Sequence, residues 1–165
     1  MTLKRRLILL VVALASFSAF AIPRPEYPRP QFERSNWINL NGEWSYTIDF
    51  SGSGFERGLV RSEGFDTKIT VPFCPESKLS GVEFKDFVEN LWYQRKISIP
   101  KEWDGKNILL NFGAVYYEAE IYVDGKFALR HFGGTTSFSV DITRLVKPGG
   151  QHNLVVYVHT AKSVG

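Results

Sequence analysis

The chain has 165 residues, of which 44% are hydrophobic and 22% are charged, and its formal net charge at neutral pH is +3. This length is sufficient for one domain with its own hydrophobic core. Lys4, Arg5 and Arg6 supply three of the 20 basic residues, so the rest of the chain balances 17 basic residues against 17 acidic ones. We therefore expect no nucleic-acid partner, because nucleic-acid binding requires an excess of positive charge to neutralise phosphates.

Residues 1–21 have the three-part pattern of a secretory signal peptide. The basic cluster is followed by an apolar run over residues 7–17 and by Ala19-Phe20-Ala21, the small-x-small pattern that signal peptidases cut after. The apolar run is too short to cross about 30 Å of hydrocarbon comfortably. We expect cleavage after Ala21, a secreted or periplasmic location, and no membrane attachment after cleavage.

The next segment, residues 22–36, is an extended proline-rich lead-in. Four prolines between residues 22 and 30 fix φ and favour extended geometry at the residues before them. We expect the folded domain to occupy residues 37–165.

The first strand is predicted before Ser51 by alternation of apolar and polar side chains, which is typical of half-buried strands. One face of this strand carries Trp44, Tyr46, Ile48 and Phe50, and the other carries Glu43, Ser45, Thr47 and Asp49. A short strand is expected over residues 68–71, and loops are expected over residues 51–54 and 74–89.

The same period of two recurs along the second half of the chain. Its apolar positions are Leu91, Tyr93, Ile97 and Ile99; Ile108, Leu110 and Phe112; Ala119, Ile121 and Val123; Phe138, Val140 and Ile142; and Leu154, Val156 and Val158. Asp124-Gly125 predicts a two-residue hairpin turn into a return strand over residues 126–132. About eight short antiparallel strands indicate an all-β fold, a jelly-roll-like β-sandwich similar to galactose-binding domains.

The sequence contains no convincing catalytic or metal-binding pattern. Glu118 and Glu120 are expected about 7 Å apart on one strand face, near the spacing of glycosidase carboxylates, but alternating glutamates are more typical of a solvated sheet surface. His131, His152 and His159 lie on separate segments without ligand-like spacing. We predict no catalytic residue, metal or cofactor. Cys74 is the single cysteine, so it forms no disulfide within the chain.

Aromatic side chains are the abundant candidates for binding. Trp44, Tyr46 and Tyr93 share strand faces with aliphatic residues, which favours a place in the core. The rings of Trp92, Tyr116 and Tyr117 are predicted to be more open, and flat rings stack on the apolar faces of sugars. These three residues are therefore candidate carbohydrate contacts.

Ordered strings of the sequence resemble a known family. They are Arg24-Pro25-Glu26-Tyr27-Pro28-Arg29-Pro30, Leu40-Asn41-Gly42-Glu43-Trp44, Val71-Pro72-Phe73-Cys74-Pro75-Glu76-Ser77, Trp92-Tyr93-Gln94-Arg95, Ile99-Pro100 with Trp103, Gly105 and Lys106, Phe112-Gly113-Ala114-Val115, Val123-Asp124-Gly125-Lys126, His131-Phe132-Gly133-Gly134-Thr135, and Phe138-Ser139-Val140-Asp141-Ile142-Thr143. Together, in this order, they resemble the sugar-binding N-terminal domain of family 2 glycoside hydrolases. The resemblance covers almost all of the chain after residue 21.

The resemblance implies a non-catalytic accessory domain of a secreted β-galactosidase-like or β-glucuronidase-like enzyme. In such enzymes the jelly roll packs against an immunoglobulin-like domain and a (β/α)₈ barrel, and two barrel glutamates carry out retaining hydrolysis. Some relatives place sugar-contacting Asn and Asp side chains where this sequence has Thr70 and His159-Thr160. Thr70, His159 and Thr160 are thus further candidate contacts. A free-standing carbohydrate-binding module or lectin, and a purely structural interaction domain, are the alternatives.

Overall fold

The computed structural model describes residues 35–161, so the predicted signal peptide and most of the proline-rich lead-in lie outside the described residues. Within this range the chain forms antiparallel strands joined by loops and three short 3-10 helices. The strands are β1 (Gly42–Ile48), β2 (Thr67–Val71), β3 (Asn90–Ser98), β4 (Leu109–Phe112), β5 (Glu118–Val123), β6 (Lys126–Phe132), β7 (Phe138–Asp141) and β8 (Gln151–His159), and the 3-10 helices are η2 (Leu59–Arg61), η3 (Lys78–Ser80) and η4 (Lys101–Trp103). No helix among residues 35–161 has the length and apolar character needed to span a membrane.

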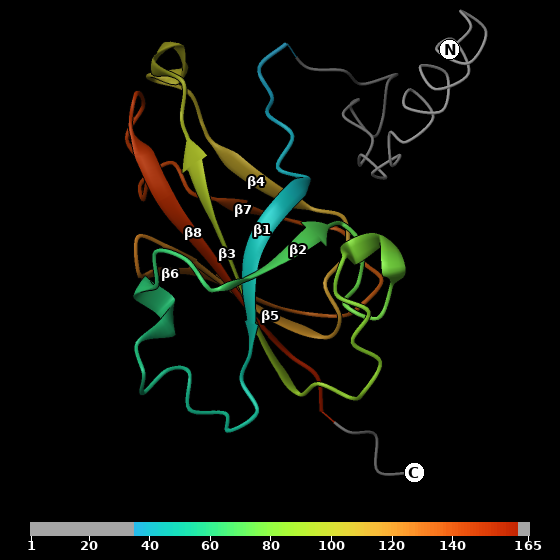
Figure 1. Cartoon of the computed structure of the whole chain (residues 1–165). Helices are drawn as coiled ribbons and strands as arrows, with labels where there is room; N and C mark the ends of the chain where they lie inside the picture. Colours follow the sequence, from blue (N-terminus) through green and yellow to red (C-terminus); the bar gives the residue numbers. More distant parts are fainter. Residues whose placement is uncertain (1–34, 162–165) are drawn as a thin grey trace, which may run out of the picture.

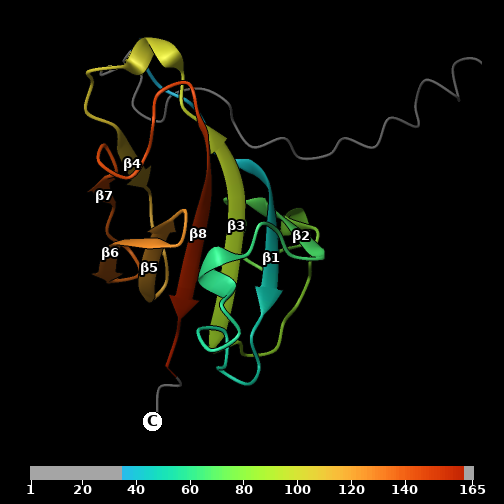
Figure 2. The same ribbon diagram turned by 90° about the vertical axis from the view of Figure 1, so that its left-hand side faces the viewer.

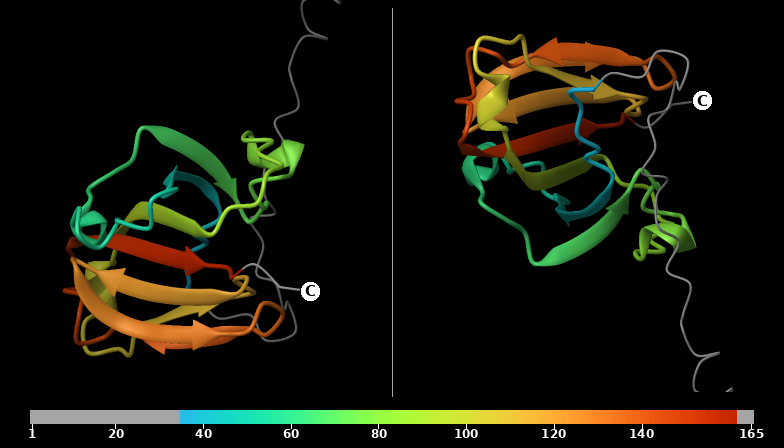
Figure 3. Two further views of the ribbon diagram at one scale, coloured as in Figure 1. Left: turned by 90° about the horizontal axis from the view of Figure 1, so that it is seen from below. Right: turned by 90° about the horizontal axis from the view of Figure 1, so that it is seen from above.

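The strands form two sheets, as the alternation pattern predicted. The large sheet has the order β2-β1-β3-β8-β5-β6 and the small one pairs β4 with β7 (Figure 1). The large sheet curves strongly, so that β4 and β7 cover its concave side (Figure 3). This is the expected all-β, jelly-roll-like antiparallel sandwich.

The main core lies between the two sheets. Trp44 and Tyr46 are 6% exposed, and Tyr93 packs against the same cluster, so the prediction that these three rings fill the core is confirmed. The aliphatic core positions of β5 and β8 are almost fully buried. Side chains alternate between the two faces of a strand, so the residues between these core positions point to the outer face of the large sheet.

The outer face of the large sheet is covered by the loop over residues 49–66. Ser45 and Asp49, predicted to lie on a polar strand face, are 4% and 2% exposed. Phe50, predicted to face the core, is instead 79% exposed because β1 ends at Ile48 and the chain turns away there. Figure 2 shows η2 and its loop in front of β3 and β8. The sheet therefore buries side chains on both faces.

The hairpin of β5 and β6 closes at Asp124-Gly125, as predicted, with positive φ of 49° and 72° at the two residues. Its register shifts between Ile121 and Tyr122, where Ile121 pairs with Leu129 but Tyr122 pairs with Phe127. This is a β-bulge, which leaves one residue of β6 unpaired and reverses the facing of the residues beyond it.

Candidate carbohydrate site at the sheet rim

Four of the six candidate contact residues meet at one end of the large sheet. Tyr116 and Tyr117 precede β5, whereas His159 and Thr160 stand at the end of β8, and β5 pairs with β8. Tyr116 is 66% exposed and Tyr117 is 49% exposed, with ring centroids 5.9 Å apart and planes at 67°. We call these four residues the rim. The rim thus combines two accessible aromatic faces with an imidazole and a hydroxyl, groups that can stack on a ligand ring and hydrogen-bond to it.

Hydrogen bonds to backbone carbonyls hold the rim in place. The Thr160 hydroxyl donates to the carbonyl of Tyr116 at 3.1 Å, and the Tyr117 N–H donates to the carbonyl of His159 at 3.4 Å. The Thr160 N–H donates to the carbonyl of Glu89 at 2.9 Å. The segments on either side of the rim are therefore joined directly, although they lie more than 40 residues apart in the sequence.

Asn90 orients the imidazole of the rim. Its Oδ1 accepts a hydrogen bond from the Tyr157 hydroxyl at 2.7 Å and lies 3.1 Å from Nδ1 of His159. The rings of Tyr157 and His159 are stacked with centroids 6.5 Å apart. Burial raises the pKa of Tyr157, and the nearby carboxylates of Glu118 and Glu120 raise it further, so this phenol stays a neutral donor. Sequence reasoning missed Asn90 and Tyr157, because their role depends on pairing between β3 and β8.

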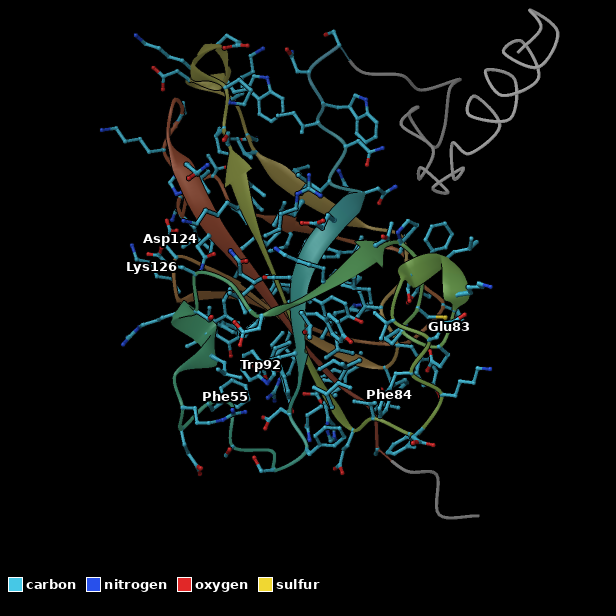
Figure 4. The ribbon with its side chains drawn as sticks, in the orientation of Figure 1. Phe55, Glu83, Phe84, Trp92, Asp124 and Lys126 are labelled. Atoms are coloured by element: carbon cyan, nitrogen blue, oxygen red, sulfur yellow. The ribbon has the colours of Figure 1, made fainter. Side chains whose placement is uncertain are left out.

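Trp92 is a correction to the predicted set. This residue is 0% exposed, and its ring packs against Tyr157 at a centroid distance of 4.6 Å and against Phe55 at 4.9 Å. Figure 4 shows Phe55 and Trp92 beside each other near the lower end of the sheet. A fully buried indole offers no face to a sugar, so Trp92 supports the rim from beneath and does not belong to its surface.

Thr70 lies away from the rim. Thr70 lies on the edge strand β2, where it pairs with Glu43 of β1. In the order of the sheet, β2 is three strands away from β8. Three strand spacings correspond to about 14 Å across the sheet. Thr70 also pairs near the start of β1, whereas Ile48, at the other end of β1, pairs near the start of β3. The fold therefore does not bring Thr70 together with His159.

The paired glutamates of β5 are also a correction, because they do not form a solvated surface. Glu120 is 4% exposed, accepts a hydrogen bond from the Tyr122 hydroxyl and is paired with the Arg130 guanidinium. Glu118 reaches Nε of Arg130 at 3.0 Å. Both carboxylates thus contact Arg130 of the neighbouring strand β6, and the positive charge of this arginine offsets the cost of burying them.

A second buried carboxylate lies beneath the covering loop. Oδ2 of Asp49 accepts hydrogen bonds from the Gly54 N–H at 2.7 Å and from Nε1 of Trp92 at 3.4 Å, and Nη2 of Arg57 reaches Oδ1 at 2.9 Å. Burial alone would raise the pKa of Asp49, but these donors, with Ser51, hold the pKa below its ordinary value. Asp49 is therefore a charged anchor for the loop.

A known protein-family model matches most of the described chain. The family model described as "Glycosyl hydrolases family 2, sugar binding domain" matches residues 62–163, which include seven of the eight strands and the whole rim. The chain belongs to this family. The resemblance of the ordered sequence strings is confirmed at this level.

The relatives of this family 2 domain include β-glucuronidases. The chain is 33% identical over 135 residues to the β-glucuronidase of Canis lupus familiaris, covering 74% of this chain and 20% of the relative. For the β-glucuronidase of Homo sapiens the identity is 30% over 120 residues, covering 67% and 18%. The solved Lactobacillus rhamnosus β-glucuronidase superposes with a TM-score of 0.67 at 29% identity, covering 75% and 21%. The family 2 domain thus spans about a fifth of the length of these relatives.

Proposed function

We propose that this family 2 domain is the N-terminal, non-catalytic accessory domain of a secreted or periplasmic glycoside hydrolase of the β-glucuronidase type. The observation that carries the proposal is the family match over residues 62–163, together with relatives named β-glucuronidase of which the aligned stretch covers 20%. The proposed partners in the longer protein are an immunoglobulin-like domain and a (β/α)₈ barrel.

The carboxylates of residues 35–161 support a non-catalytic role. Retaining glycosidases need two carboxyl groups about 5 Å apart on either side of the bond that is cleaved. The buried carboxylates Asp49 and Glu120 are each occupied by protein donors, and Glu118 is tied to the same Arg130 as Glu120. None of these three carboxylates is open to a substrate, so the proposal assigns hydrolysis to the barrel.

The proposed task of the rim is to contact carbohydrate. The exposed rings of Tyr116 and Tyr117 provide stacking faces, and the side chains of His159 and Thr160 provide hydrogen-bonding groups at the edge. Such a surface contributes orientation and affinity without supplying a catalytic acid.

A hydrolysis assay tests the non-catalytic role. The 165-residue chain is mixed with aryl-β-glucuronide and aryl-β-galactoside, and we expect no release of the aryl group above background. Turnover that persists through repeated purification would contradict the proposal.

A binding assay tests the rim. Calorimetric titration with glucuronate and galactose is expected to give saturable binding with a dissociation constant of about 1 µM to 1 mM, which Tyr117→Ala weakens. Phe50→Ala is the matched control, because this ring is 79% exposed and lies outside the rim. Equal binding by both variants would remove the rim from the proposal.

The free-standing carbohydrate-binding module remains the second candidate function, and the 66% exposure of the Tyr116 ring favours it. The coding sequence after residue 165 separates the two. An open reading frame that encodes a barrel supports the accessory domain, and a stop codon supports the free-standing module.

A further inference from the structure

The imidazole of His152, near the start of β8, joins two turns of the chain. Its Nδ1 lies 2.7 Å from Oδ2 of Asp124, in the turn between β5 and β6. Its Nε2 accepts a hydrogen bond from the Lys147 N–H at 2.8 Å, in the turn between β7 and β8. The side chain of His152 is only 10% exposed. One largely buried ring therefore holds the two turns together.

The turn over residues 147–150 has backbone hydrogen bonds of its own. The Gly150 N–H donates to the carbonyl of Lys147 at 2.9 Å, and Gly149 has a positive φ of 79°, which is the geometry of a type II turn with Pro148 at its second position. The Gly149 N–H also donates to the carbonyl of Ile99 at 2.7 Å. The backbone beside the imidazole is therefore held in a defined conformation.

These contacts fit one protonation state of the His152 ring. In a neutral imidazole one nitrogen donates and the other accepts. Nε2 must carry the lone pair, because the Lys147 N–H points at it, and Nδ1 must carry the hydrogen, because it faces the carboxylate of Asp124. The other tautomer and the imidazolium would both direct an Nε2–H at the Lys147 N–H. His152 is therefore neutral in this arrangement, with its hydrogen on Nδ1.

The charged groups around the imidazole come from several elements. Asp124 is in direct contact with the ring, whereas β3 places the uncharged Ile97 opposite His152. Three exposed lysines lie around this pair: Lys126 at the start of β6, which lies near Asp124 (Figure 4), Lys147 in the turn itself, and Lys101 of η4, which lies beside Gly149. The carboxylate is therefore the charged group that acts on the ring at closest range.

Asp124 stays ionised in the pH range in which histidine side chains titrate. Burial alone would raise the pKa of Asp124, but the Asn153 N–H, which donates to Oδ1 at 2.8 Å, and the imidazole of His152 hold the pKa below its ordinary value. Histidine side chains ordinarily change charge between about pH 5 and pH 8. A proton taken up by this pair in that range therefore goes to Nε2 of His152 and not to the carboxylate.

We propose that His152 is a pH-sensitive latch between the β5–β6 turn and the β7–β8 turn. When Nε2 takes up a proton from solvent, it loses the hydrogen bond from the Lys147 N–H, whereas the Nδ1–H bond to Asp124 becomes an ion pair. The new Nε2–H has an acceptor within reach in the Lys147 carbonyl oxygen, 3.2 Å away, which already accepts from the Gly150 N–H. The turn over residues 147–150 therefore rearranges on protonation, while the turn at Asp124 stays attached. The latch goes beyond the proposed function and does not depend on it.

Nuclear magnetic resonance of the isotopically labelled 165-residue chain tests the latch. At about pH 8 we expect a hydrogen on Nδ1 of His152 and none on Nε2, and Nε2 gains a hydrogen as the pH falls to about 5. The amide resonance of Lys147 is expected to shift with the same midpoint. His131 is the internal comparison, because its ring stacks on Phe138 and lies near the Thr136 hydroxyl. Its titration is expected to leave the Lys147 amide unchanged.

His152→Asn is the matched variant. The asparagine amide nitrogen takes the place of Nδ1 and can donate to Asp124, but no atom takes the place of Nε2. We expect the Lys147 amide of this variant to lose its shift between about pH 8 and pH 5. A circular dichroism melting curve establishes that the variant is folded, and the position of the hydrogen on the ring is measured on the unchanged chain.

Three results would overturn the inference. The first is a hydrogen on Nε2 of His152 at about pH 8, because the Lys147 N–H would then have no acceptor on the ring. The second is a Lys147 amide that does not follow the titration of His152 in the unchanged chain. The third is a Lys147 amide that shifts with the same midpoint in His152→Asn, because another group would then cause the shift.

Discussion

The indole nitrogen of Trp92 lies 3.4 Å from Oδ2 of Asp49 and donates a hydrogen bond to it. This contact connects the middle of the large sheet to the loop that covers it, because the same oxygen accepts from the Gly54 N–H. The outer face under the loop is therefore a second core built around a charged group. Four testable consequences concern this core and the glutamate network beside it.

Replacing Asp49 is expected to destabilise the fold. Asp49→Ala leaves the buried N–H groups of Gly54 and Trp92 without their acceptor, and each unsatisfied buried donor costs about 1–3 kcal/mol. Urea unfolding followed by tryptophan fluorescence measures the loss. Asp86→Ala, at an exposed position of the 74–89 loop, is the control and is expected to change stability by less than about 0.5 kcal/mol. An equal effect of both substitutions would contradict the role of Asp49.

The stabilising effect of Asp49 should depend on pH in one direction. Its pKa is lower in the folded chain than in the unfolded chain, so the charged form stabilises the fold above the unfolded-state pKa of about 3.9. This contribution is lost as the pH falls through the folded-state pKa. We expect the difference in unfolding free energy between the unchanged chain and Asp49→Asn to be constant near neutral pH and to shrink below about pH 4. A difference that grows in acid would refute this account.

Gly54 is expected to tolerate no side chain. A Cβ at this position would lie 2.4 Å from Nε1 of the buried Trp92, so Gly54→Ala forces the loop or the indole to move and costs about 1–3 kcal/mol. Gly113→Ala is the matched control, since an added Cβ there meets no atom within 4 Å and neither glycine has a positive φ. Thermal unfolding of the two variants gives the comparison, and similar melting temperatures would show that the loop does not press on Trp92.

We expect Glu118 and Glu120 of β5 to affect the pKa of Tyr122 differently. Burial raises the pKa of Tyr122, and the hydrogen bond to Glu120 raises it further. Glu120→Ala removes an acceptor and a negative charge from the phenol, so the pKa of Tyr122 should fall toward its ordinary value. Glu118→Ala is the control, because it leaves the contact between Tyr122 and Glu120 intact. Ultraviolet titration of the phenolate measures both, and identical curves would contradict the assignment.

The strands follow from the sequence because alternation of apolar and polar residues is a local property. The turn at Asp124-Gly125, the inner-face positions of Trp44 and Tyr46, and the two-sheet architecture all depend on the period of two and on short-range turn chemistry. The ordered strings likewise led to the family, which the match over residues 62–163 confirms. The placement of the signal peptide stays a prediction.

Only the tertiary structure decided which side chains of the outer face see solvent. Trp92 and Glu120 alternate as half-exposed residues should, yet the loop over residues 49–66 and the neighbouring Arg130 bury them. The bulge that aligns Phe127 with Arg130 is equally invisible in the spacing, because it depends on how β6 pairs with β5. Alternation assigns side chains to the two faces of a strand, but contacts between residues distant in the chain determine what covers each face.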